Sequence, residues 1–273
     1  MKTLENQTLL YDADCPLCNL YTSGFIKAGL LDKNGKKPFS GLTNEEQNFI
    51  DTKRASNEIA LIDNQNKTVI YGIDSLLKVI GNSIPLVEKI GKMQPIHFLL
   101  KKLYSFISFN RKVIVPNRQP QKNEIQCLPD FNYRYRIAYI IFSGLMTALI
   151  LWKFSGLIPY FPTSGFYPEL LLAFGQLIFQ GFFLLSTDTK TRWNYFGNLM
   201  TVSLMGSLLL TPILIVGKFF EISPIFVLGW FGCVVCLMFF EHLRRVQLLQ
   251  LPKFLCFTWI IYRLIALIII LNL

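Results

Sequence analysis

Two cysteines near the N-terminus are the residues of this chain best suited to chemistry. Cys15 and Cys18 are separated by two residues and follow a short apolar run, Leu9–Asp12, that predicts a β-strand. The apolar side chains after Cys15 recur at helical spacing, and Pro16 suits the first position of a helix, where no backbone N–H is needed. This spacing places both thiols within about one helical turn, where a disulfide between them can form and break.

The position of the pair before a helix predicts different roles for the two thiols. A thiolate at a helix N-terminus is stabilised by unpaired backbone N–H groups and by the helix dipole. Cys15 is expected at the exposed end as the nucleophile, and Cys18, one turn further on, as the resolving thiol. Asp12 and Asp14 oppose a low thiolate pKa through like-charge repulsion. Alternatively, one of them accepts the proton of Cys18, and we take Asp12 as the third candidate catalytic residue.

Half of a zinc site is the main alternative for this pair. Such a site needs two further ligands within reach, and the soluble part of the chain offers only His97 and Cys127, neither of them well spaced. We therefore expect no metal here and no cofactor other than the dithiol. A quinone bound in the membrane part is a weaker alternative.

The second half of the chain has the composition of a membrane protein. The chain has 273 residues, of which 52% are hydrophobic, and from residue 137 onward long apolar runs alternate with short polar turns. About 20 residues of helix span a bilayer. We predict a soluble domain at 1–115, a linker at 116–136 and a transmembrane helix bundle at 137–273. The five expected spans lie at about 137–157, 167–186, 196–216, 223–240 and 254–272.

The distribution of positive charge predicts an orientation. Lys and Arg concentrate before the first span and in the second and fourth turns, which the positive-inside rule places in the cytoplasm. The first apolar run is too short for a secretory signal. We therefore predict a protein of the cytoplasmic (inner) membrane with its N-terminal domain in the cytoplasm and its C-terminus outside. The formal charge of the chain is +10, but its sequence shows no basic groove with interleaved aromatics. We therefore expect the lipid bilayer, and no nucleic acid, as a partner.

A second cysteine pair lies in the fourth predicted span. Cys233 and Cys236 are three residues apart, and Cys236 is about 6 Å from the predicted cytoplasmic end of that span. The two thiols could therefore exchange electrons with the first pair. Alternatively, together with Gly229 and Gly232, they form a stripe of small residues that packs against another helix. Both interpretations stay open.

Several polar residues also fall within the predicted spans. Arg263 lies near the middle of the fifth span, where an arginine costs about 2.5–3.5 kcal/mol and should therefore face protein or water. Gln176 in the second span is expected at a similar depth. These residues form either a structural contact or a pocket for a ligand or quinone, and those at the end of the fourth span could also be headgroup anchors. The candidate polar site comprises Glu169, Gln176, Gln180, His242, Arg244, Arg245 and Arg263.

The first part of the chain resembles a known family. Tyr11-Asp12-Ala13-Asp14-Cys15-Pro16-Leu17-Cys18 resembles the signature of the DCC family of thiol-disulfide oxidoreductases, an aspartate, two residues and C-x-x-C after an apolar strand. Further pieces match in order over residues 8 to about 116: Gly72-x-Asp74 after a predicted hairpin (Glu58–Asp63 and Thr68–Tyr71), then Leu103-Tyr104 and Asn110-Arg111 in a closing helix. The resemblance implies an α/β thioredoxin-like domain and a dithiol role for Cys15 and Cys18.

Two comparisons limit this resemblance. Thioredoxins carry a cis-proline before a central strand, facing the dithiol, whereas Arg54–Asn57 precedes the predicted strand here without a proline. The strand followed by Asp12-Ala13-Asp14 also resembles the start of haloacid-dehalogenase phosphatases. Those enzymes need Thr or Val where this chain has Pro16, and they need a later acidic pair that is missing here.

We therefore predict a membrane-tethered thiol-disulfide oxidoreductase. Its Cys15/Cys18 dithiol would exchange with a thiol-containing protein or a small thiol at the cytoplasmic face, and its membrane part would receive electrons or serve as an anchor. The alternative is a membrane ligand-binding or transport bundle that a redox-sensing cytoplasmic domain regulates.

Overall fold

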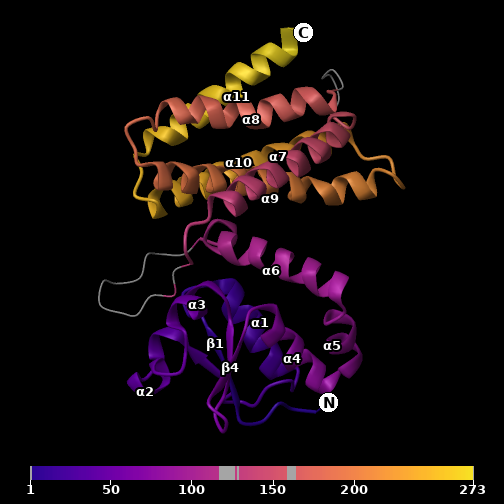
Figure 1. Ribbon diagram of the computed structural model, residues 1–273. Helices are drawn as coiled ribbons and strands as arrows, with labels where there is room; N and C mark the ends of the chain where they lie inside the picture. The colour runs from indigo at the N-terminus through magenta and orange to yellow at the C-terminus, as the bar shows by residue number, and fades with distance from the viewer. Residues whose placement is uncertain (1, 117–126, 128, 159–163, 273) are drawn as a thin grey trace. The chain divides into compact units, whose positions relative to one another are not determined.

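The computed structural model describes residues 2–116, 127, 129–158 and 164–272 (Figure 1). The chain divides into two compact units, Met1–Tyr135 and Arg136–Leu273. Most of the predicted linker, residues 117–126 and 128, lies outside the described residues.

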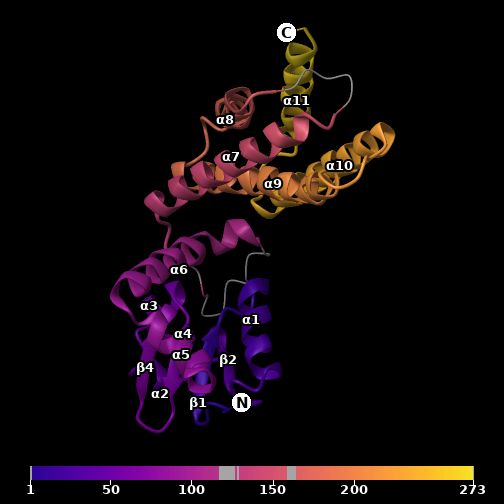
Figure 2. The ribbon, with the colours of Figure 1, turned by 90° about the vertical axis from the view of Figure 1, so that its right-hand side faces the viewer.

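The first unit is built on a four-stranded sheet with the order β2-β1-β3-β4 (Figure 2). β1 pairs in parallel with β2 and antiparallel with β3, and β3 pairs antiparallel with β4. The predicted hairpin is confirmed as β3 and β4. The polar, Gly- and Lys-rich stretch Asp32–Lys37 is typical of a loop, yet its end belongs to β2. The strands are β1 (Gln7–Tyr11), β2 (Lys36–Pro38), β3 (Ala60–Asp63) and β4 (Thr68–Tyr71).

Helices surround this sheet. The helix predicted after Cys15 and the closing helix that holds Leu103-Tyr104 and Asn110-Arg111 are present as α1 and α6. The helical segments are α1 (Pro16–Lys27), the 3₁₀ turn η1 (Phe39–Gly41), α2 (Asn44–Gln47), α3 (Thr52–Asn57), α4 (Ile73–Ser83), α5 (Pro85–Gly91) and α6 (Gln94–Ile114).

Both faces of the sheet are buried. Successive side chains of a strand point to opposite faces, so Leu9 and Leu61 pack with residues of α1, α4 and α6. Leu10 and Ile62 belong instead to a second cluster that includes Phe39 and residues around α3. This two-sided core gives the first unit the α/β thioredoxin-like fold that the sequence predicts.

The second unit consists of helices. α7, α9 and α10 are long and apolar enough to cross a membrane, so the chain is a membrane protein. α11 has a shorter apolar stretch, Phe254–Ile270, and α8 has 17 residues, so the predicted number of five spans is approximate. The helices are α7 (Tyr133–Ser155), α8 (Phe166–Phe182), α9 (Thr189–Val216), α10 (Pro224–Leu248) and α11 (Phe254–Asn272).

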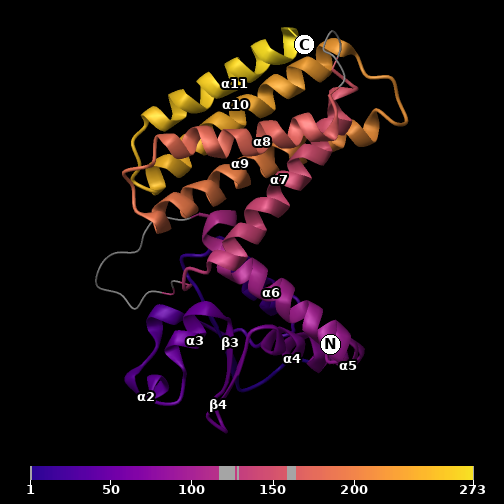
Figure 3. The same ribbon diagram turned by 45° about the horizontal axis from the view of Figure 1, so that its top comes forward.

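Two antiparallel helix pairs organise the second unit, and the helices can be followed in Figure 3. The start of α9 meets the end of α10, where the Tyr195 hydroxyl lies 3.1 Å from Nε2 of His242. In the second pair, α8 and α11, the amide of Gln180 donates to the Leu255 carbonyl, and the hydroxyl of Tyr262 donates to a carbonyl of α8.

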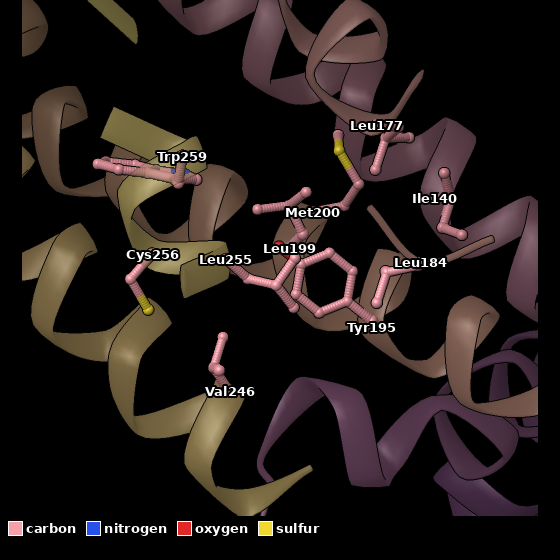
Figure 4. Close-up of a cluster of buried hydrophobic side chains, with 10 residues drawn as sticks. All are labelled: Ile140, Leu177, Leu184, Tyr195, Leu199, Met200, Val246, Leu255, Cys256 and Trp259. Atoms are coloured by element: carbon pink, nitrogen blue, oxygen red, sulfur yellow. The ribbon is translucent and has the colours of Figure 1, made fainter. Parts of the chain in front are cut away.

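A buried apolar cluster joins these pairs (Figure 4). It draws on all five helices, which is why short helices such as α8 can still be held in the bundle. The buried members are Ile140, Leu177, Leu184, Tyr195, Leu199, Met200, Val246, Leu255, Cys256 and Trp259.

Candidate functional site

The dithiol lies where β1 turns into α1. Cys15 is the N-cap residue of α1 with extended backbone angles, and Pro16 occupies the first helical position, as the sequence predicts. The N–H of Cys15 donates to the Asp12 carbonyl at 3.1 Å, which closes a tight turn at the end of β1. Cys18 follows in the first turn of the helix, and both cysteines are free thiols.

The expectation that Cys15 lies at an exposed end is wrong. Its exposed fraction is 1%, and that of Cys18 is 8%. The sequence places Cys15 at a helix terminus, which is usually solvated, but the tight turn after β1 keeps this residue against the folded domain. A reaction with an external disulfide therefore requires a local opening of the site.

The two thiols ionise very differently. The pKa of Cys15 is lowered to about 6, chiefly by the hydrogen bond from the Cys18 thiol and also by the backbone N–H of Cys18, although burial and the charge of Asp12 oppose this shift. The same hydrogen bond, together with burial, raises the pKa of Cys18 well above its usual value. The pair therefore holds one thiolate, on Cys15, and one proton, on Cys18.

Asp12 is buried beside two cations of α6. Its Oδ2 atom lies 3.0 Å from Nζ of Lys112 and 3.5 Å from a guanidinium nitrogen of Arg111, and its exposed fraction is 4%. These cations compensate the charge that Asp12 brings close to the thiols. The hypothesis that Asp12 accepts the proton of Cys18 stays a prediction.

Arg111 connects the dithiol region to the rest of the site. Its guanidinium donates to the Ser56 carbonyl at 2.9 Å and to the carbonyl and sulfur of Cys127 at 3.1 and 3.3 Å. Because an arginine is permanently charged, it lowers the thiol pKa values of Cys15 and Cys18 from inside the domain. The sequence showed Arg111 only as part of the family resemblance and gave it no role.

A cavity of about 240 Å³ opens beside Cys18. Most of its lining is apolar, and Tyr104 borders it through a hydroxyl that accepts from the N–H of Ile59 at 2.7 Å. No group of three or more potential metal ligands occurs among the described residues. The residues with polar or ionisable side chains that line the cavity include Asp12, Cys18, Tyr21, Tyr104, Arg111 and Cys127.

The second cysteine pair lies elsewhere than the sequence predicts. Cys233 and Cys236 are the tenth and thirteenth of the 25 residues of α10, because the helix continues to Leu248 instead of ending near residue 240. Cys236 is therefore about 18 Å from the end of the helix, not about 6 Å. Both cysteines are exposed, and a Cβ added at Gly229 or Gly232 would meet no described atom within 4 Å. This stripe does not pack inside the second unit, and its redox role stays a prediction.

The continued helix also relocates three residues of the candidate polar site. His242 and Arg245 are buried in the bundle, with exposed fractions of 1% and 2%, and so do not act as headgroup anchors. Arg245 donates to Asn198 of α9 at 2.8 Å and to Glu241 at 2.7 Å. Arg244 is the exposed member and pairs with Glu241. These pairings let a charged turn extend an apolar helix.

The remaining polar residues lie on α8 and α11. Glu169, Gln176 and Gln180 are all buried, as the predicted polar face requires. Gln180 accepts from Thr258 at 3.1 Å, whereas Arg263 stacks over the ring of Trp259 at 5.2 Å. Gln180 therefore forms hydrogen bonds to α11, and whether the face binds a ligand stays a prediction.

Comparison with known proteins adds one finding. Residues 9–115 match the model of the DCC1-like thiol-disulfide oxidoreductase family. The comparisons with curated proteins and with solved structures gave no match. The matched segment runs from β1 to the end of α6 and contains the dithiol and the Arg111–Asp12 pair, whereas Cys127 lies beyond it. Residues 9–115 therefore form a DCC1-like thiol-disulfide oxidoreductase domain, and the chain joins this domain to a membrane part.

Proposed function

We propose that this chain is a membrane-tethered enzyme that reduces disulfides with the dithiol of Cys15 and Cys18. The Cys15 thiolate attacks one sulfur of a substrate disulfide, forms a mixed disulfide and releases the other substrate sulfur as a thiolate. Cys18 then loses its proton and attacks Cys15, which releases the second substrate thiol. Two electrons pass to the substrate, and the enzyme keeps a Cys15–Cys18 disulfide.

The observation that carries this proposal is the opposite ionisation of the two thiols. A pKa of about 6 leaves Cys15 largely ionised at neutral pH, and the thiolate is the form that attacks disulfides. The pKa of Cys18 is raised chiefly by its hydrogen bond to Cys15. When Cys15 forms a mixed disulfide, its negative charge and the hydrogen bond from Cys18 are lost. The pKa of Cys18 therefore falls at the step in which Cys18 must lose its proton.

We also propose an orientation and a class of partner. The positive charges before α7 favour a cytoplasmic N-terminal domain, and the cytosolic thiol pool is reducing. The dithiol should therefore rest reduced, donate electrons, and be regenerated by a protein thiol or a small thiol. We expect it to need no further cofactor.

Mixed-disulfide trapping in the full-length protein tests this proposal. Without the resolving thiol, a Cys18→Ser variant exposed to oxidised glutathione should accumulate glutathione on Cys15, measured by mass spectrometry of the digested protein. A matched Cys15→Ser variant should accumulate less on Cys18, because burial still raises the pKa of the remaining thiol when the hydrogen bond to Cys15 is gone. The proposal fails if the two variants trap glutathione equally, or if Cys15 never carries it.

A further inference from the structure

A third thiol belongs to the cluster around the dithiol. Cys127 lies after α6, outside the segment that matches the family, yet it lines the same cavity as Cys18. One nitrogen of Arg111 lies 3.3 Å from the sulfur of Cys127 and 3.5 Å from Oδ2 of Asp12. The same buried cation therefore connects Cys127 to the turn that carries the dithiol.

Cys127 is held at this place by specific contacts. Arg111 also donates to the Cys127 backbone carbonyl at 3.1 Å. Three residues on, the N–H of Asp130 donates to the side chain of Asn57 at 2.7 Å, and the amide of Asn57 donates back to the Asp130 carboxylate at 3.0 Å. Ser56 and Asn57 are the last residues of α3, in the segment before β3 where thioredoxins carry their cis-proline.

One hydrogen-bond donor of the Arg111 guanidinium is not used by the described residues. The exposed fraction of Arg111 is 6%, and its Nε atom has no hydrogen-bond partner among the described residues. A buried donor without a partner is costly, so a negatively charged sulfur in the cavity would be stabilised. This cluster is more than one isolated cysteine, because it combines two thiols and one cation around one cavity.

We propose that Cys127 is a third redox thiol, which exchanges with the Cys15–Cys18 disulfide to give a Cys18–Cys127 disulfide. This inference rests on the proposed function, because that reaction supplies the starting disulfide.

The exchange is balanced without any added oxidant. Cys127 loses its proton to solvent, and its thiolate attacks the sulfur of Cys18, the member of the pair that lines the cavity. The Cys18–Cys127 bond forms, the Cys15–Cys18 bond breaks, and Cys15 leaves as a thiolate. The number of disulfides stays at one, so the step is an isomerisation.

The identity of the leaving group favours this direction. A thiol with a low pKa leaves a disulfide fastest. The hydrogen bond from the Cys18 thiol is absent in this step, but the backbone N–H of Cys18 and the charge of Arg111 still lower the pKa of Cys15. The attacking group is less favourable, because burial raises the pKa of Cys127 to about 11, although Arg111 opposes that rise. The exchange should therefore accelerate as the pH rises toward 11.

The exchange requires the two sulfurs to approach each other. Cys18 and Cys127 line the same cavity, and their Cβ atoms must come within about 3.5–4.5 Å for a disulfide to form. In the product, Cys15 is a free thiolate without its resolving partner, so a second substrate would stay bound to it.

Disulfide mapping of the full-length protein tests the inference. The reduced protein is oxidised with oxidised glutathione at pH 7, 8 and 9, quenched with acid, alkylated and digested. We expect a cross-linked peptide of Cys18 and Cys127 with Cys15 alkylated, forming about tenfold faster per pH unit. A Cys127→Ser variant should stop at the Cys15–Cys18 disulfide, and the matched control Cys256→Ser, at a buried cysteine of the second unit, should behave as the wild type.

The outcomes separate this inference from the proposed function. A Cys15–Cys18 disulfide with Cys127 alkylated at every pH would overturn the inference and leave the function intact. If no disulfide forms among Cys15, Cys18 and Cys127 at any pH, and Cys15 never carries glutathione, both would be overturned. The disulfide map of the wild-type protein tests the inference by itself, so the test still holds if the Cys127→Ser variant does not fold.

Discussion

At the scale of single residues, the reactivity of this domain comes from how its charges are arranged around two sulfurs. Cys18 donates to Cys15, Arg111 supplies a buried positive charge, and Asp12 opposes both. The effect of Asp12 is limited because Lys112 and Arg111 pair with it. The net result is a thiolate at Cys15 despite a neighbouring carboxylate.

Alkylation at graded pH should reveal this thiolate. The folded pKa of Cys15 lies below its usual value, so labelling by iodoacetamide in the full-length protein should rise through a midpoint near pH 6. Cys127 gives an internal comparison, because its pKa of about 11 predicts labelling only at high pH. A midpoint near pH 9 for Cys15 would contradict the arrangement of charges described here.

Replacing Asp12 separates its electrostatic effect from its structural one. An Asp12→Asn variant removes the negative charge that raises the pKa of Cys15, so the labelling midpoint should move below that of the wild type. Arg111 and Lys112 lose their partner, which should lower the free energy of unfolding by about 3 kcal/mol, measured by denaturant titration. The control is Glu45→Gln, at an exposed carboxylate of α2, which should change neither quantity. An upward shift of the midpoint would be inconsistent with the role given to Asp12.

The sequence predicts only part of this site. The spacing of Cys15, Pro16 and Cys18 is local, so their place at a helix start could be predicted. The contributions of Arg111 and Cys127 could not, because about a hundred residues separate them from the dithiol and only the fold brings them together. Burial of Cys15 was missed for the same reason, since helix ends are exposed unless tertiary contacts cover them.

At the scale of elements, the sequence predicts a helix or hairpin well where its hydrogen bonds form between residues close together in the chain. The hairpin β3–β4 and helix α1 have local turn and capping signals, and both appear as predicted. β2 has only polar residues and Pro38, and its hydrogen bonds depend on the distant strand β1. The length of α10 was misjudged because buried pairings of Arg245 extend it beyond its apolar run.

One glycine fixes the connection between β4 and α4. Gly72 has a φ of +66°, and a Cβ there would approach the carboxylate of Glu58, on the cavity rim, to 2.9 Å. A Gly72→Ala variant should therefore lose about 1–2 kcal/mol of unfolding free energy. A Gly24→Ala variant in α1, where a Cβ meets nothing within 4 Å, should instead be neutral or slightly stabilised. Equal effects of the two substitutions in thermal denaturation would show that the Gly72 backbone conformation is not required.

At the scale of the whole molecule, the number of helices that cross the membrane decides on which side each later turn lies. Among the described residues, three helices meet the requirements of length and hydropathy, whereas α8 is short and α11 has a shorter apolar stretch. If only those three cross, both ends of α8 lie on the same side. If all five cross, the ends of α8 lie on opposite sides.

Reporter fusions distinguish these arrangements. We predict an outside signal at Gly165, an inside signal at Thr189 and an outside signal after Leu273, because Lys190 and Arg192 favour the cytoplasm. An outside signal at Thr189 would exclude a spanning α8 and reverse the predicted orientation of the helices that follow.

The central claim is that Cys15 and Cys18 cycle between a dithiol and a disulfide. Its most direct test is to equilibrate the full-length protein with glutathione at graded ratios of oxidised to reduced form. The peptide that contains both cysteines is then analysed by mass after alkylation. In a Cys127→Ser background, where no Cys18–Cys127 disulfide can form, we predict that it passes, as the oxidised fraction rises, from two alkyl groups to none, with the loss of two hydrogen atoms. A variant that also carries Cys15→Ser should never do so. A peptide that keeps both alkyl groups at every ratio, or a purified protein that holds stoichiometric zinc at these thiols, would contradict the account.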